Sequence, residues 1–132
     1  MLVHPGGPYW QNKDQGAWSI PKGEFFPPED SIVAARREFF EETGVAVKGD
    51  LRALKPARQP GGKIVHAWAV EGDLDVATVV SNTFEIEWPP RSGRLQSFPE
   101  VDRAAWFMLP EAARKIVRGQ APLLAEFAQM LR

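Results

Sequence analysis

The chain has 132 residues, and its 16 Lys and Arg against 17 Asp and Glu give a net charge of −1. This length suits one domain, which we expect to span residues 1–132. The absence of Cys excludes disulfides, thiolate zinc sites and a cysteine nucleophile. The balanced charge argues against a nucleic-acid-binding surface. No apolar run approaches the length of a membrane helix, and residues 1–5 lack the basic and apolar regions of a signal peptide, so we expect a cytoplasmic protein with a small-molecule partner.

The N-terminal part of the chain predicts short strands followed by a helix. Apolar residues 2–3 and 17–20 read as strand pieces, separated by the turn-rich segment 5–8 and a polar loop at 11–16. Asp30 is a good N-cap for a helix over residues 31–43, and Gly44 stands where a left-handed C-cap is expected.

The rest of the chain alternates between strand and helix signals. We predict strands over 63–70, 83–88 and 104–107, the first covered on both faces and the second half-buried. Pro110 opens a short helix that reaches Val117, and a last helix spans residues 122–131. This mixture indicates an α/β or α+β sandwich.

Charge is concentrated in the predicted helix and the segment before it. Residues 24–45 contain six acids and two bases, a local balance of −4. A helix advances about 100° per residue, so Glu38, Glu41 and Glu42 share one face while Phe39 points elsewhere. Two interpretations are open: a solvated face with an Arg37 to Glu41 ion pair, or a site for a hard cation such as Mg²⁺.

The spacing around the helix is more specific than the acids alone. Five residues separate Gly23 from Glu29, seven more lead to Arg37 and Glu38, and Glu41, Glu42, Gly44 and Val45 complete the pattern. Over residues 23–45 this sequence resembles the Nudix box in full. The fixed positions carry chemically restrictive residue types, so the pattern indicates the family strongly and the substrate weakly.

The resemblance implies a Nudix-type α/β/α sandwich with a mixed sheet. It also implies a pyrophosphohydrolase that cleaves a nucleoside diphosphate linked to another moiety, with Mg²⁺, or Mn²⁺, as the cofactor. By position, Glu41 and Glu42 would be the main metal ligands, and Glu38 a further ligand or the base that orients water. Arg37 would hold these carboxylates by ion pairing, the Gly23 carbonyl would be a backbone ligand, and Glu29 would support the helix start.

Several candidate residues lie outside the helix. The family often adds another Glu, and of Glu85, Glu87 and Glu100 we favour Glu100, because residues 98–106 resemble the stretch in which diadenosine tetraphosphate hydrolases place a Glu before a strand Trp. Residues 18–23 also resemble the lead-in of that branch and of diphosphoinositol polyphosphate hydrolases.

Lys22 directly precedes Gly23 and could contact a phosphate; the alternative interpretation is a solvated lysine in a turn. Three aromatic residues could stack on a base or could instead pack in the core: Tyr9, Trp10 and Trp88. Arg91 and Arg94 are candidates for contact with phosphates. His4 and His66 have no motif around them and are expected to be structural.

The expected substrate is a dinucleoside polyphosphate or a nucleoside triphosphate. ADP-ribose, a diphosphoinositol polyphosphate, or nucleotide sensing without cleavage remain as alternatives. Family members usually carry another strand before the segment matched here by residues 2–7. Either the start is truncated or another element substitutes for that strand. A missing strand would expose a sheet edge or a core face, so we hypothesise that two copies pair as a homodimer.

Overall fold

The chain has an α+β fold in the computed structural model, which describes residues 1–21, 30–58 and 61–131. The strands are β1 (Leu2–Pro5), β2 (Arg52–Ala53), β3 (Ala57–Arg58), β4 (Ile64–Val65), β5 (Trp68–Ala69), β6 (Thr83–Glu87), β7 (Leu95–Pro99) and β8 (Val101–Ala105). The helices are α1 (Ser31–Thr43), α2 (Leu109–Lys115) and α3 (Ala121–Met130), with 3₁₀ turns η1 (Val76–Thr78) and η2 (Arg118–Gln120). No helix within the described ranges has the length and apolar character needed to cross a membrane.

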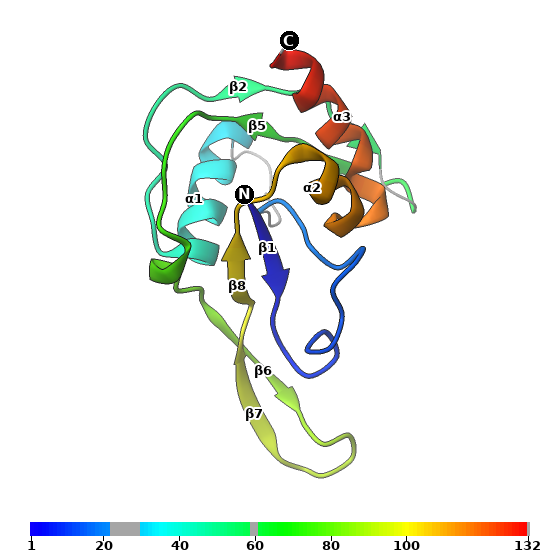
Figure 1. Cartoon of the computed structure of the whole chain (residues 1–132). Coiled ribbons are helices and arrows are strands. Elements are labelled where there is room, and N and C mark those ends of the chain that lie inside the picture. The colour runs from blue at the N-terminus through cyan, green and yellow to red at the C-terminus, as the bar shows by residue number, and fades with distance from the viewer. Residues whose placement is uncertain (22–29, 59–60, 132) are drawn as a thin grey trace.

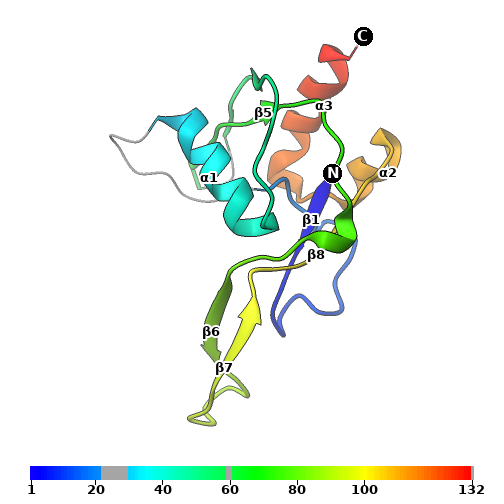
Figure 2. The same cartoon turned by 90° about the vertical axis from the view of Figure 1, so that its left-hand side faces the viewer.

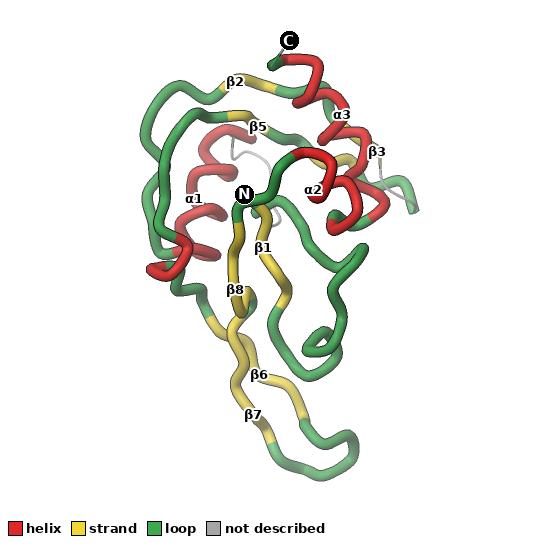
Figure 3. Tube along the Cα trace, in the orientation of Figure 1, coloured by secondary structure: helices red, strands yellow, loops and turns green. Residues whose placement is uncertain are grey.

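The strands form four antiparallel pairs, β1 with β8, β2 with β5, β3 with β4, and β6 with β7 (Figure 3). Parallel pairing in the described part of the chain is confined to one bridge, between Trp18 and Ile116. In both views α1 lies on one side of β1 and β8, and α2 and α3 lie on the other (Figures 1 and 2). The expected layering of helices around strands is therefore confirmed.

The ends of α1 follow the capping signals in the sequence. The side chain of Asp30 accepts a hydrogen bond of 3.1 Å from the Ile32 N–H. Gly44 has φ +75°, and its N–H donates to the Phe40 carbonyl at 2.7 Å. The predicted helix 31–43 is thus confirmed at both ends, because the two caps satisfy backbone groups that a helix leaves unpaired.

Three small clusters of buried apolar residues make the core. One joins β1 to α2 through Leu2, Trp18 and Ile116, and another packs Leu123 of α3 under β3 and β4. The third cluster lies between β1 and β8. Together they pack the N-terminal strand and the C-terminal helices against their neighbouring strands.

The predicted strand 63–70 is two short strands in the structure. β4 pairs with β3 and β5 pairs with β2, and the Leu54 N–H donates to the Ala67 carbonyl between them at 3.0 Å. The register shifts by one residue between these pairs. Pro56, which has no N–H to contribute, lies in the facing segment at this point and accounts for the interruption.

The β6–β7 hairpin projects from the body of the molecule, and its base is attached to α1 (Figures 1 and 2). The Asn82 N–H donates to the Glu41 carbonyl, and the Glu100 N–H donates to the Asn82 carbonyl, each at 2.8 Å. These two bonds bring the start of β6 and the junction of β7 and β8 to the C-terminal end of α1.

Candidate active site

The carboxylates of α1 are organised by one guanidinium. Nη1 of Arg37 lies 2.8 Å from Oε1 of Glu38 and 3.3 Å from Oε1 of Glu41. Arg37 and Glu41 stand four residues apart, where side chains on a helix meet. The ion pair expected from the sequence is therefore confirmed, and it holds both carboxylates around a single positive charge.

Glu38 is the more enclosed of these two acids. Its side chain is only 15% exposed. Burial raises the pKa of Glu38, Arg37 opposes that rise through its charge and its hydrogen bond, and the charges of Glu41 and Glu100 add to it. A carboxyl group of this kind binds a proton more readily than an ordinary glutamate does.

Glu100 lies at the junction of β7 and β8, next to α1. Its charge acts on Glu38, and its backbone is bonded to Asn82, which is in turn bonded to Glu41. The structure thus brings Glu100 to the carboxylates of the helix although 57 residues separate Glu100 from Glu42 in sequence. Glu85, the second choice from the sequence, is exposed within β6 and pairs across the hairpin with Ser97.

The other residues of the box are only partly covered by the structure. Glu42 is half-buried on α1 and has interaction partners of its own. Lys22, Gly23 and Glu29 lie outside the described residues. Their expected roles, as phosphate contact, backbone metal ligand and helix support, stay predictions.

The carboxylate oxygens on α1 are the type of ligand that a hard divalent cation prefers. Glu38 and Glu41 already converge on one cation, the guanidinium of Arg37, and Mg²⁺ is commonly held by one or two carboxylates together with substrate phosphates. Within residues 1–21, 30–58 and 61–131 no three His, Asp or Glu side chains are grouped to hold a metal ion. A metal ion held by carboxylates of α1 would therefore need other donors as well, and the phosphate oxygens of a substrate are the natural complement.

The substrate-binding candidates of the hairpin lie far from these carboxylates. Trp88 follows β6, and Arg91 and Arg94 belong to the turn that leads into β7. In both views this turn is at the free end of the hairpin, away from α1 (Figures 1 and 2). The structure does not gather them at the helix, although the same hairpin carries Glu100 there.

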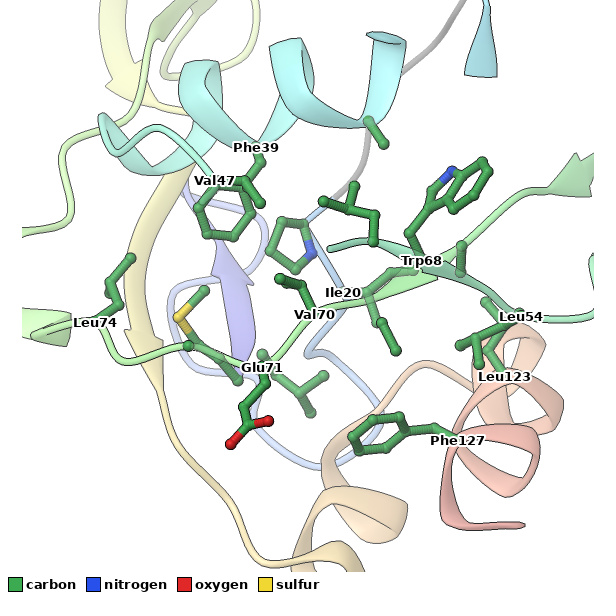
Figure 4. Close-up of a pocket in the computed structure, with 18 of the residues that line it drawn as sticks. Ile20, Phe39, Val47, Leu54, Trp68, Val70, Glu71, Leu74, Leu123 and Phe127 are labelled. Atoms are coloured by element: carbon green, nitrogen blue, oxygen red, sulfur yellow. The ribbon is translucent and has the colours of Figure 1, made fainter. Parts of the chain in front are cut away.

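A large apolar cavity lies on the other side of α1. It has a volume of about 750 Å³, and α1 contributes Ala35 and Phe39 to its wall (Figure 4). Phe39 projects about 160° around the helix from Glu41, so the cavity and the carboxylates occupy different faces of α1. Further parts of the wall come from residues 45–49, from β5 and the segment after it, and from α2 and α3.

Polar groups are few in this cavity. Glu71 is among the lining residues, and the indole N–H of Trp68 is buried with no hydrogen-bond partner among the residues that the structure describes. The acids among its lining residues, Glu71 and Asp73, come from the segment after β5 and not from α1. We therefore place the candidate active site on the carboxylate face of α1. The sequence had no signal for the cavity, because its lining is assembled from residues spread over the whole chain.

A sequence model of the NUDIX domain matches residues 2–127 of the chain. The chain belongs to the Nudix family. No solved structure matches the chain. A Nudix domain indicates a hydrolase of the pyrophosphohydrolase type that acts on small-molecule derivatives of nucleoside diphosphates, and Nudix enzymes generally use divalent metal ions such as Mg²⁺.

Proposed function

We propose that this Nudix domain is a Mg²⁺-dependent pyrophosphohydrolase whose substrate is a dinucleoside polyphosphate or a nucleoside triphosphate. The observation that carries the proposal is the group formed by Glu38, Glu41 and Arg37, with Glu100 brought close to it by the hairpin. Phosphoryl transfer leaves little covalent work to a protein, so positioning and charge neutralisation dominate catalysis.

Glu41 and Glu42 would hold the metal ion, with the Gly23 carbonyl as a backbone ligand. The ion supplies positive charge that offsets the phosphate oxygens when it is bound. Arg37 would keep Glu41 in place by the contact seen at 3.3 Å, so that the carboxylate is oriented before substrate arrives.

Glu38 would be the base that takes a proton from the attacking water. Burial raises the pKa of its carboxyl group, and a base whose pKa is closer to the working pH accepts a proton more effectively. Water oxygen forms a bond to phosphorus, the anhydride P–O bond breaks, and the leaving phosphate takes the electron pair. Glu100 would tune Glu38 through its negative charge, or serve as a further ligand.

Lys22 would contact a phosphate of the substrate from its position directly before Gly23. ADP-ribose and diphosphoinositol polyphosphates are the second group of substrates, since the box fixes the chemistry and other residues select the ligand. A nucleotide sensor that does not cleave is a third candidate, and the intact set of Glu38, Glu41 and Glu42 favours catalysis over it.

Product analysis by chromatography tests the proposal. The protein and Glu42→Gln would be incubated with diadenosine tetraphosphate, ATP, ADP-ribose and a diphosphoinositol polyphosphate, with Mg²⁺ or with a chelator. We expect Mg²⁺-dependent cleavage by the unmodified protein and a loss of at least about a hundredfold in Glu42→Gln, equivalent to about 2.7 kcal/mol of transition-state stabilisation. Absence of cleavage with every substrate by a folded protein would favour the sensor.

The cytoplasmic location and the homodimer stay predictions. At Val3, β1 is bonded to Ser19 on one edge and paired with Ala104 of β8 on the other. In the described part of the chain, the outer edges of β6 and β7 have no strand partner, so they are the edges on which a second copy would pair. A monomeric mass by light scattering at micromolar concentration would contradict the dimer.

A further inference from the structure

The free end of the β6–β7 hairpin meets the loop that follows β1. The rings of Tyr9 and Trp88 are in an edge-to-face contact with centroids 5.2 Å apart. Nearer the hairpin base, Phe84 lies so close to Gly7 that a Cβ at Gly7 would stand 2.9 Å from its ring. The loop is therefore packed along one face of the hairpin, from Phe84 to Trp88.

This end of the molecule exposes aromatic rings beside basic side chains. Tyr9 is 55% exposed and Trp10 is 39% exposed. The ammonium of Lys13 lies 5.0 Å from the Trp10 ring centroid. Arg91 and Arg94 are exposed, and neither forms an ion pair with a carboxylate among the residues that the structure describes. Exposed rings and unpaired cations together suit a ligand that carries both an aromatic base and phosphates.

The register of the hairpin keeps acids off this face. Cross-strand partners share a face, so Ile86 and Gln96 lie on the side of Phe84 and Phe98. By alternation Trp88 belongs to the same side. The acids of β6 lie on the opposite side, and Glu87 accepts a hydrogen bond from the Gly93 N–H within the turn. A phosphate chain on the Trp88 face would therefore meet cations and neutral groups.

The distance from this end to α1 restricts the ligand. Asn82 is bonded to Glu41 and directly precedes β6, and Trp88 directly follows β6. The six residue steps between Asn82 and Trp88, at about 3.4 Å each, place Trp88 about 20 Å from Asn82. A ligand that reaches both the carboxylates of α1 and the Trp88 ring must be long, with its reactive phosphates at one end and an aromatic base at the other.

We propose that Tyr9, Trp10 and Trp88, with Arg91 and Arg94, form a second anchoring site that binds the far nucleoside and adjacent phosphate of a two-ended substrate. The inference rests on the proposed function and specifies it, because it selects dinucleoside polyphosphates over one-ended nucleotides. The rings would stack on the base, and the guanidiniums would pair with phosphate oxygens, to which Arg can donate two hydrogen bonds.

Steady-state kinetics with diadenosine tetraphosphate and ATP test the inference. The double variant Arg91→Gln/Arg94→Gln should raise the KM for diadenosine tetraphosphate relative to that for ATP by about tenfold, as expected for loss of charge-assisted contacts. Arg52→Gln removes an exposed arginine from β2, at the opposite end of the molecule in Figure 1, and should leave that ratio unchanged. Equal effects on both substrates, or no effect on either, would overturn the second site.

A second pair of variants tests the aromatic rings of the proposed site. Tyr9→Leu should raise the same KM ratio, and Tyr9→Phe should restore it, because the ring and not the hydroxyl stacks on the base. A raised KM ratio in both variants, or in neither variant, would contradict stacking of the Tyr9 ring on the base. Circular dichroism of each variant shows whether the fold is kept.

Calorimetric titration separates failure of this inference from failure of the proposed function. If the unmodified protein cleaves neither nucleotide, the proposed hydrolase fails, and binding of diadenosine tetraphosphate to metal-free protein then decides the inference. Dissociation constants about tenfold higher in Arg91→Gln/Arg94→Gln than in Arg52→Gln would support the second site. Equal constants, or no binding to the unmodified protein, would refute it.

Discussion

His4 offers a sharp test of how the loop after β1 is held. Its side chain is fully buried, with Nδ1 2.9 Å from Oδ1 of Asp102 on β8 and Nε2 2.6 Å from the Lys13 carbonyl. Its ring also meets Trp18 edge to face, with centroids 5.1 Å apart. Since a carbonyl and a carboxylate only accept, Nε2 donates to the Lys13 carbonyl and Nδ1 donates to Asp102. The side chain thus ties the loop to both central strands, in the structural role expected from the sequence.

His4→Phe keeps an aromatic ring against Trp18 and removes both hydrogen bonds. A bond to a charged partner such as Asp102 contributes about 1.5 to 3 kcal/mol, and one to a neutral carbonyl about 0.5 to 1.5 kcal/mol. The free energy of unfolding should therefore fall by about 2 to 4.5 kcal/mol, a large part of the roughly 5 to 15 kcal/mol of a typical domain. For a chain of this length the melting temperature should drop by about 10 °C or more.

Urea unfolding followed by tryptophan fluorescence measures this change. His66→Phe, at the exposed second histidine, is the matched control and should alter the free energy of unfolding by less than about 1 kcal/mol. Asp102→Asn and the double variant complete a mutant cycle that isolates the His4 to Asp102 interaction. A His4→Phe protein within about 0.5 kcal/mol of the unmodified one would refute the assignment of His4 as the tie between loop and strands.

Three further predictions concern α1 and the core. Burial raises the pKa of Glu38, so its ionisation costs free energy in the folded chain. Glu38→Gln should therefore stabilise the metal-free protein at pH 8 but not at pH 4, below the ordinary value of 4.5; urea midpoints that rise equally at both pH values would disagree. Gly44→Ala should cost about 1 to 2 kcal/mol in thermal unfolding, because φ is +75° and its Cβ would stand 2.9 Å from the Val80 carbonyl oxygen; an unchanged melting temperature would count against this. Leu123→Ala, at a residue only 2% exposed, should cost about 2 to 5 kcal/mol in urea, whereas Leu123→Met should cost less than about 1.5 kcal/mol.

Local signals predicted the helix and its surroundings well. Asp30 and Gly44 fixed the ends of α1 because capping depends on single residues with particular side chains or φ angles. Strict alternation predicted β6, which ends one residue earlier than expected, at Glu87. The C-terminal helices were also predicted, with bounds shifted by one or two residues.

Strand pairing and long-range placement were harder to predict. β7 was missed because Leu95, Gln96 and Ser97 are all exposed, so no burial alternates along it. The strand predicted at 104–107 begins at Val101 and ends at Ala105, and the indole of Trp106 instead donates to the Leu74 carbonyl. These features depend on partners far along the chain, which hydrophobic periodicity does not contain.

The same contrast applies to the candidate site. The carboxylate face and the Arg37 to Glu41 pair follow from helical spacing, whereas the approach of Glu100 to Glu38 depends on how the hairpin is bonded to α1. The cavity behind Phe39 draws on residues from Met1 to Phe127 and had no sequence signal. The sequence also did not predict that Trp88 lies far from α1, because this distance depends on the length and direction of β6.

The central claim is that the carboxylates of α1 hold the catalytic metal ion. Its most direct test is the initial rate of phosphoanhydride cleavage as a function of Mg²⁺ concentration, for the unmodified protein and for Glu41→Gln. Loss of one ligand should raise the Mg²⁺ concentration at half-maximal rate by about tenfold or more and lower the maximal rate. Superimposable curves for the two proteins would contradict the assignment of Glu41 as a metal ligand, and with it the proposed active site.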